Sequence, residues 1–292
     1  MNPLKWLLVV VAGAGLCFAA SATGFFFAVD RSVANTEFVS RWLTKQNLAA
    51  FAASTEELQG DKLSAAEASL LSRTGISLIE PEIKKQAKPM LDPFFDFLKG
   101  KRKEPRLAID LNGLKQDPAF IRNAADIVRG NETMKYVPSP VVESAAKLLL
   151  EKLPGELDFL KILHISASDL THLRFVADKF YGYYHTALGF SLFFAALIIF
   201  LLRDKRKIAL ALGIVLFVAG LLMFIPYMGS EVLATKMFSR YKGVAPEVVK
   251  TFSVSLIRDF FGVYVLSPVI LFLAGLTGLI TGLFVFKKPR EK

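Results

Sequence analysis

The sequence predicts a mainly α-helical membrane protein with four transmembrane helices and a mostly helical domain inserted between the first and second spans. Three observations support this fold class. Long uncharged apolar runs alternate with charged segments, the stretch after the first run has the pattern of amphipathic helices, and excess positive charge lies in short segments beside the runs. Apolar residues make up 53% of the 292 residues, and the long runs assign much of this content to lipid.

The first span is expected within residues 1–29, because Trp6 to Val29 holds no charged residue over 24 positions. At about 1.5 Å per residue, this run can cross a hydrocarbon core of about 30 Å. A cleaved signal peptide is the alternative, since Lys5 precedes the run and the Ala-Ser-Ala sequence at 20–22 resembles a cleavage site. The run exceeds a usual signal-peptide core, and cleavage would leave three phenylalanines near the new N-terminus, so we favour an uncleaved span.

Residues 30–168 are predicted to form the helical domain on the extracytoplasmic side. Apolar residues recur at helical spacing in 36–53, and the segment 64–67 has the form of a capping box ahead of a helix that Gly75 should end. A longer helix is expected from Pro81 to Gly100, with kinks or a break at its internal prolines.

The second half of this domain contains two further helix starts. Asp117 and Ser139 each stand directly before a proline, a pattern typical of an N-cap followed by the first helical residue, and these helices should end near Gly130 and Pro154. Only the segment 107–111 has the character of a strand. A single strand makes no sheet, so this segment either pairs with an unrecognised partner or stays extended.

Residues 169–292 are predicted to form a stalk helix and a three-span bundle, with spans at about 185–202, 208–227 and 261–286. A helix lying at the membrane interface or against the domain is expected over 249–260. An apolar seam with 3-4-3-4 spacing continues without proline into the second span, which predicts a rigid stalk that couples the domain to the bundle. This seam comprises Leu170, Leu173, Ala177, Phe180 and Tyr184.

The distribution of charge predicts the orientation of the spans. Asp30 to Lys179 contains 22 basic and 21 acidic side chains, whereas most of the net charge of +10 lies in Lys5, the turn 203–207 and the tail 287–292. Positive charge beside spans marks the cytoplasmic side, so both termini and the turn should lie inside. Because the excess charge adjoins apolar runs, the lipid bilayer is its expected partner, and nucleic-acid binding is not expected.

Two sets of residues are candidates for contacts. A basic run could touch an anionic surface or form a solvated loop, and its members are Lys99, Lys101, Arg102 and Lys103. Small residues at four-residue spacing allow close helix packing, either within this bundle or against a partner subunit. They are Gly13, Cys17 and Ser21 in the first span and Ala274, Gly278 and Gly282 in the last.

We expect no catalytic, cofactor or metal site. Ser144 and Lys147 match the S-x-x-K pattern of a nucleophile, but its partner motifs are missing and an amphipathic helix surface explains both residues. His164, Asp169 and His172 are too few to complete a zinc site and are expected on a solvated stalk. The one cysteine, Cys17, lies inside the first span, so the outer domain has no disulfide.

One block of the chain resembles uncharacterised bacterial four-span membrane proteins: Glu82–Lys84, Pro93–Gly100 and Leu107–Leu111. This resemblance implies a multi-pass protein of the bacterial cytoplasmic membrane and no known activity. The order of one span, a large outer domain and three further spans is similar to that of mechanotransmitting ABC transporter subunits. The cytoplasmic turn and N-terminus are short, however, and leave little surface for an ATPase.

Together, these observations predict a non-enzymatic integral membrane accessory or scaffold protein. Its outer domain is expected to bind an envelope protein or polymer, or a second copy of the chain. A transmembrane subunit of a mechanotransmitting ABC-type transporter is the first alternative. A membrane-anchored enzyme of unknown reaction is the second.

Overall fold

The computed structural model describes residues 3–48, 73–129, 136–151, 155–162, 165–229 and 247–285. These residues are mainly helical, and four of their helices are long and apolar enough to cross a membrane, which confirms the predicted fold class at this level. The four candidate spans are Pro3–Arg31, Ala167–Leu202, Lys205–Met228 and Ser253–Val285.

The chain divides into two compact units. We call them the membrane unit, which comprises residues 1–35, 176–240 and 254–292, and the helical unit, which comprises residues 36–175 and 241–253.

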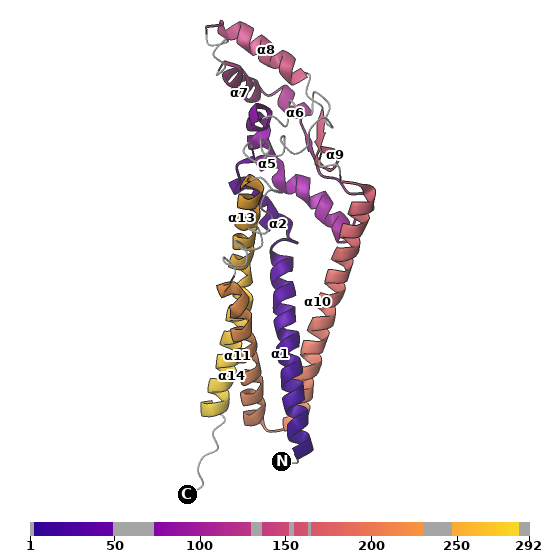
Figure 1. The fold of residues 1–292 in the computed structure, drawn as a ribbon, viewed down its shortest axis with the longest axis vertical. Helices are drawn as coiled ribbons and strands as arrows, with labels where there is room; N and C mark the ends of the chain where they lie inside the picture. The colour runs from indigo at the N-terminus through magenta and orange to yellow at the C-terminus, as the bar shows by residue number, and fades with distance from the viewer. Residues whose placement is uncertain are drawn as a thin grey trace. The chain divides into compact units, whose positions relative to one another are not determined.

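In the helical unit, α2 (Thr36–Lys45) packs against α5 (Arg73–Leu98). The predicted stop at Gly75 and start at Pro81 are wrong, because α5 runs through both positions and keeps three prolines inside it. Its ribbon bends along its length (Figure 1). Burial of Ile79 and Ile83 on one face explains why the helix continues, since packing compensates for the hydrogen bond that a proline removes.

The predicted helix over 36–53 is shorter in the structure, where α2 ends at Lys45. The predicted capping box at 64–67 lies outside the described residues.

Three helices follow: α6 (Asn112–Lys115), α7 (Pro118–Arg129) and α8 (Ser139–Glu151). The start of α7 is as predicted, because the Ala119 N–H donates to Asp117 Oδ1 at 2.9 Å and Pro118 is the first helical residue. The start of α8 lies one residue earlier than predicted, since the Pro138 carbonyl already accepts from the Val142 N–H at 3.2 Å. The two helices pack together (Figure 1).

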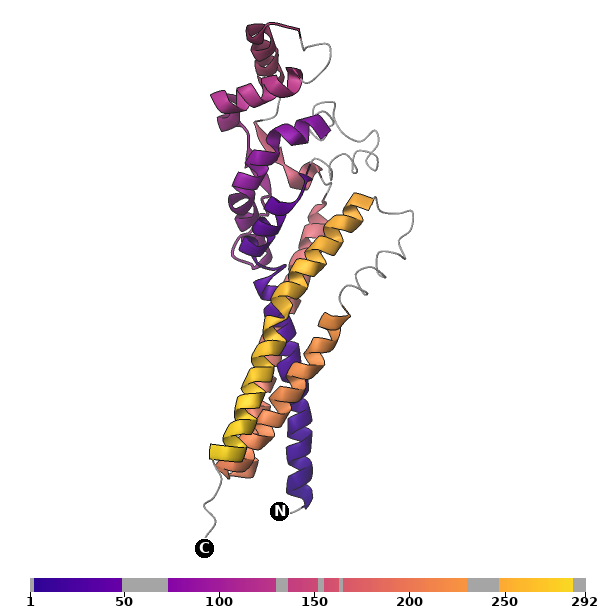
Figure 2. The same ribbon diagram turned by 90° about the vertical axis from the view of Figure 1, so that its left-hand side faces the viewer.

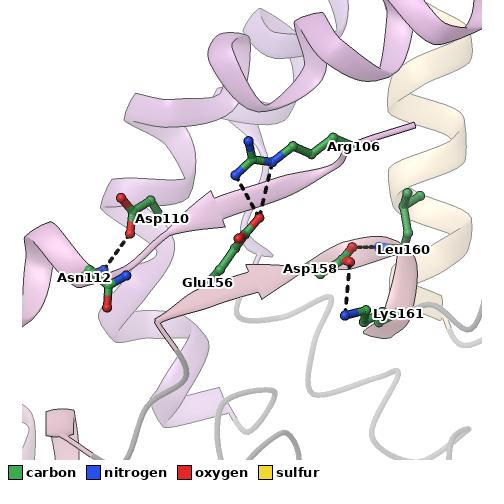
Figure 3. A network of polar contacts seen from close by, with 7 residues as sticks. All are labelled: Arg106, Asp110, Asn112, Glu156, Asp158, Leu160 and Lys161. Carbon is green, nitrogen blue, oxygen red and sulfur yellow. Dashed lines mark hydrogen bonds and ion pairs between the residues drawn. The ribbon is translucent and has the colours of Figure 1, made fainter. Parts of the chain in front are cut away.

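The predicted strand pairs with a segment that the sequence pattern did not reveal. Strand β1 (Ala108–Asp110) lies antiparallel to β2 (Glu156–Asp158), with buried Ile109 opposite buried Leu157. The short helix α9 (Phe159–Ile162) follows β2 directly. Figure 3 shows how the pair is held at its surface, where Arg106 Nη2 donates to Glu156 Oε1 at 3.0 Å.

Each strand ends in an aspartate, and its carboxylate accepts a hydrogen bond from a backbone N–H of the helix that follows (Figure 3). Asp110 Oδ1 accepts from the Asn112 N–H at 2.8 Å, and Asp158 Oδ1 accepts from the Leu160 N–H at 3.0 Å. A carboxylate in this position starts the helix that follows, so the sheet is framed by α6 and α9. The core of the helical unit draws on α5, the sheet, α7 and α8, and includes Ile79, Ile83, Ile109, Leu111, Phe120, Val142, Leu150 and Leu157.

The helix α10 (Ala167–Leu202) is continuous over 36 residues, as the seam pattern predicted. Its start is a capping box, because the Asp169 N–H donates to Ser166 Oγ and the Ser166 N–H donates to Asp169 Oδ2. The helix α11 (Lys205–Met228) begins three residues before the predicted span. Only Arg203 and Asp204 therefore separate the two helices, and Asp204 caps α11 by accepting from the Arg206 N–H at 2.9 Å.

The last span begins earlier than predicted. Helix α13 (Glu247–Tyr264) continues through Val265 into α14 (Leu266–Ile280) and the π-helical turn η3 (Thr281–Val285). The candidate span starts at Ser253, so most of the segment expected as a separate interfacial helix over 249–260 belongs to it. Because Arg258 and Asp259 are the only charged residues of this candidate span, the apolar helix extends past them.

Within the membrane unit, α11 packs along α14, and α1 (Pro3–Arg31) contacts both (Figure 2). Helix α10 meets α1 through side chains, with Phe194 and Ile198 against Ala12 and Leu16.

Candidate functional site

Helix α8 carries two apolar stripes, and the helical unit covers only one of them. Val142, Ala146 and Leu150 recur at four-residue spacing and are buried in the core. The second stripe follows an i, i+4, i+7 spacing and comprises Val141, Ala145 and Leu148. At 100° per residue, this stripe adjoins the buried one, so the apolar arc of α8 is wider than its own core requires.

The second stripe faces outward. Val141 is 56% exposed and Leu148 is 61% exposed, and Tyr136, just before the helix, is 89% exposed. Ala145 lies between them and is half-buried. We call these four residues the α8 patch; three of them lie on one apolar helix face, which is suited to pack against another protein.

Contacts between α7 and α8 position the α8 patch. Arg129 Nη2, at the end of α7, donates to Ser139 Oγ at 2.7 Å and so holds the start of α8. Phe120, Ala124 and Ala125 of α7 enter the core beside the buried stripe of α8. The patch therefore stands on a helix whose opposite side is fixed by packing.

The predicted basic residues lie together in one exposed loop after α5. Gly100 has φ 73°, a conformation that favours glycine, and the Lys101 N–H bonds back to the Asp96 carbonyl at 2.8 Å. Lys101 Nζ also lies 3.9 Å from Asp96 Oδ1. Lys99, Arg102 and Lys103 are exposed, so the loop offers positive charge to solvent.

Of the small residues predicted in the last span, two face α11 and one is exposed. Gly278 and Gly282 face α11, since an added Cβ would lie 3.0 Å from Gly213 Cα or 2.7 Å from Leu210 Cγ. Ala274 is exposed, and Gly275 instead occupies that level of the contact, so the seam of α14 runs over Gly275, Gly278 and Gly282.

In α1, Gly13 also faces α11, 3.3 Å from Val215 Cγ2 by the same measure. Cys17 is half-buried. Ser21 Oγ is buried and has no hydrogen-bond partner among the described residues.

The predicted stalk seam divides between the two units. Leu170 packs with Phe97 and Leu160 in a small cluster of the helical unit, whereas Leu173 is exposed and Ala177 is half-buried. The other two members, Phe180 and Tyr184, belong to the membrane unit and contact α1 there. Phe26 lies 5.2 Å from the Phe180 ring and 6.4 Å from the Tyr184 ring, centroid to centroid.

The residues with chemical motifs serve local structure. Ser144 Oγ donates to the Pro140 carbonyl at 2.8 Å, and Lys147 is exposed. Asp169 is engaged in the cap of α10, His172 is exposed, and His164 lies outside the described residues. In the part of the chain that the structure describes, no three His, Cys, Asp or Glu side chains come together as a metal site.

Comparisons with known proteins add no relative. No family model matches the chain, and neither a curated protein nor a solved structure matches it. The class of protein is therefore the one that the fold itself defines, a mainly helical multi-pass membrane protein.

The residues predicted from the sequence do not include the α8 patch. The signal was present in the sequence. Three apolar residues stand at positions 141, 145 and 148, outside the stripe that Val142, Ala146 and Leu150 already complete.

Proposed function

We propose that this chain is a non-enzymatic accessory or scaffold protein of a bacterial cytoplasmic membrane, whose helical unit binds another envelope protein through the α8 patch. The observation that carries the proposal is the second, exposed apolar stripe of α8, with Val141 and Leu148 more than half exposed. Water-exposed apolar residues that adjoin on one helix face are a common feature of interaction sites.

The chemistry of the patch favours a protein partner over a polymer. The patch contains aliphatic side chains and one tyrosine, which bury well against an apolar groove or a second helix. A charged polymer would instead be attracted to the loop of Lys99, Lys101, Arg102 and Lys103, which lies elsewhere in the unit.

The proposed orientation places the helical unit outside and the turn between α10 and α11 inside. Its support is the concentration of basic residues at that turn and at both ends of the chain. Ser139→Cys and Lys205→Cys, each in a Cys17→Ser background, test it with a membrane-impermeant thiol reagent on intact cells. Labelling at position 139 alone is expected, and labelling at position 205 from outside would overturn the orientation.

Site-specific photocrosslinking tests the partner. A photoreactive amino acid at position 141 or 148 of the full chain should give an adduct with the same protein in cells, because both positions lie on the patch. Positions 143 and 147 are the matched controls, since Glu143 and Lys147 are exposed on the other side of the same helix. Equal adducts from all four positions, or none from 141 and 148, would contradict the proposal.

A second candidate function has one specific observation in its favour. Helix α10 is unbroken from Ala167 to Leu202 and so joins the helical unit to the membrane unit by a continuous element. A movement of one unit can reach the other through such an element, which is what mechanotransmission requires. A stoichiometric ATPase that accompanies the chain during purification in mild detergent would support this function, and its absence from a complex with the photocrosslinked partner would favour the accessory role.

A further inference from the structure

An open pocket of about 370 Å³, which we call the cavity, lies between helices of the membrane unit. All four spans line it, and α1 supplies the longest wall. The other lining residues are Tyr184 and Ser191 of α10, Leu216 of α11, and Ser267, Ile270 and Leu271 of α14. Its volume falls in the range of about 300–1,000 Å³ that is usual for ligand pockets. Nothing in the proposed function uses this cavity.

The wall on α1 shows the length of the cavity. Its residues follow one stripe of the helix from Leu16 to Phe27, with Ala20, Thr23 and Gly24 between them. Eleven residues of helix span about 17 Å. This is close to half of a hydrocarbon core that is about 30 Å thick, so the cavity has the length of a lipid chain in one leaflet.

The lining favours an apolar occupant, and its one buried hydroxyl without a hydrogen-bond partner among the described residues is that of Ser267. Most of the wall is aliphatic or aromatic, and two of its hydroxyl groups are already engaged by backbone carbonyls. Thr23 Oγ1 donates to the Ala19 carbonyl at 2.8 Å, and Ser191 Oγ donates to the Ala187 carbonyl at 2.9 Å. Because each hydroxyl has only one hydrogen to donate, these groups offer little to a ligand except hydrocarbon contact.

One end of the cavity lies at a belt of aromatic and charged residues. Phe27 closes this end, and the Arg31 guanidinium stands 5.3 Å from the centre of its ring. On the neighbouring helix, the Tyr181 hydroxyl donates to Asp30 Oδ1 at 3.1 Å. Rings and charges at the end of a span mark the level of lipid headgroups, and Arg31 is exposed there.

We infer that this cavity holds one acyl chain of an anionic phospholipid, drawn from the leaflet at which α1 ends, with the phosphate group beside Arg31. The length of the cavity matches the chain, its wall matches hydrocarbon, and the exposed guanidinium at its end attracts the headgroup. A lipid so held fills the space between α1 and α10 and becomes part of their contact.

The test uses the full chain in detergent with added phosphatidylglycerol, and native mass spectrometry counts the lipids that stay bound. One phosphatidylglycerol per chain is expected. Ser191→Phe puts a ring into the cavity and should abolish this retained lipid. The matched control is Ala196→Phe, which places the same ring on an exposed position of the same helix and should leave the lipid bound.

Two further variants make the result decisive. Leu216→Trp fills the cavity from α11. If both Ser191→Phe and Leu216→Trp lose the lipid, misfolding of one variant alone does not explain the loss. Arg31→Gln should weaken retention of phosphatidylglycerol about fivefold while leaving phosphatidylcholine unchanged, because only the anionic headgroup loses a favourable charge. Unchanged retention in both filling variants, or retention of a free fatty acid in place of the phospholipid, would overturn the inference.

Discussion

Two helix contacts in the membrane unit are built in opposite ways. Helices α11 and α14 meet through glycines, and an added Cβ at Gly213 or Gly220 would lie 2.7 Å from backbone nitrogen atoms of α14. Helices α1 and α10 meet through large rings, such as Phe26 against Phe180, with the cavity beside them. The first contact leaves no room between the backbones, and the second holds them apart.

This difference shows what each contact depends on. In lipid, helices associate through van der Waals packing, and small residues maximise it by letting backbones approach closely. Rings contact only at their own edges and faces, so they leave gaps that something apolar must fill. We therefore expect the α11–α14 contact to be intolerant of added volume and the α1–α10 contact to depend on individual rings.

The largest effect is expected from Gly275→Leu. An added Cβ at Gly275 overlaps the backbone of Phe217 on α11, and backbone cannot move aside as a side chain can. Overpacking of this kind should lower the free energy of unfolding by about 3 kcal/mol. Ala274→Leu is the matched control, since Ala274 is the exposed neighbour and should change stability little. Reversible unfolding in mixed micelles measures both, and equal losses would show that the glycine contact does not set stability.

The next effect concerns the continuity of α10. Ala177→Pro removes a hydrogen bond inside this helix, which costs about 3 kcal/mol locally. With few backbone contacts to hold it, α10 should bend there while its membrane span stays inserted. Spin labels at Ser139→Cys and Lys205→Cys, with Cys17 replaced, should report a broader distance distribution than in the parent. Ala167→Pro is the control, because the first helical position accepts proline, and its distribution should be unchanged.

The distance distribution of the parent protein is equally informative. A narrow distribution is expected if α10 works as a rigid stalk. A broad parent distribution would remove the stalk from the mechanism, and so would a narrow one that Ala177→Pro leaves unaltered.

A smaller effect is expected where rings support the looser contact. Phe26→Ala removes an edge-to-face contact with Phe180 and a tilted contact with Tyr184, and should destabilise the membrane unit by about 1–2 kcal/mol. Phe18→Ala is the control, because Phe18 is 79% exposed on the same helix and should behave as a lipid-facing ring. If the two variants unfold alike, the rings between α1 and α10 are not a structural contact.

The comparison also explains what the sequence could predict. Hydropathy alone located all four spans, because crossing the membrane is a property of each segment by itself. The choice of Gly275 over Ala274 was not predictable, since both fit a small-residue pattern and only the position of α11 decides which one faces it. The cavity left no signal, because it is the space between residues from four spans.

Two features of the helical unit also could not be predicted from the sequence. The partner strand β2 has only three residues, so its alternation was too short to recognise. The sequence predicts a helix start at Pro81 because local propensity disfavours proline inside a helix, but the burial of Ile79 and Ile83 outweighs this preference and α5 continues.

The smallest effect is expected from Ser267→Ala, which tests whether the buried hydroxyl of Ser267 has a hydrogen-bond partner at the cavity. Ser267 of α14 lines the cavity, and its Oγ is buried without a hydrogen-bond partner among the described residues. A buried hydroxyl without a partner lowers stability, so Ser267→Ala should leave the free energy of unfolding unchanged or raise it by up to about 1 kcal/mol. Ser191→Ala is the matched control, because the Ser191 hydroxyl is paired with Ala187 and with Thr23, 3.2 Å away. Its removal should instead cost about 0.5–1 kcal/mol. Measured in micelles with and without phosphatidylglycerol, a loss of stability in Ser267→Ala that exceeds the loss in Ser191→Ala would mean that the Ser267 hydroxyl is used, and that a bound molecule supplies its partner.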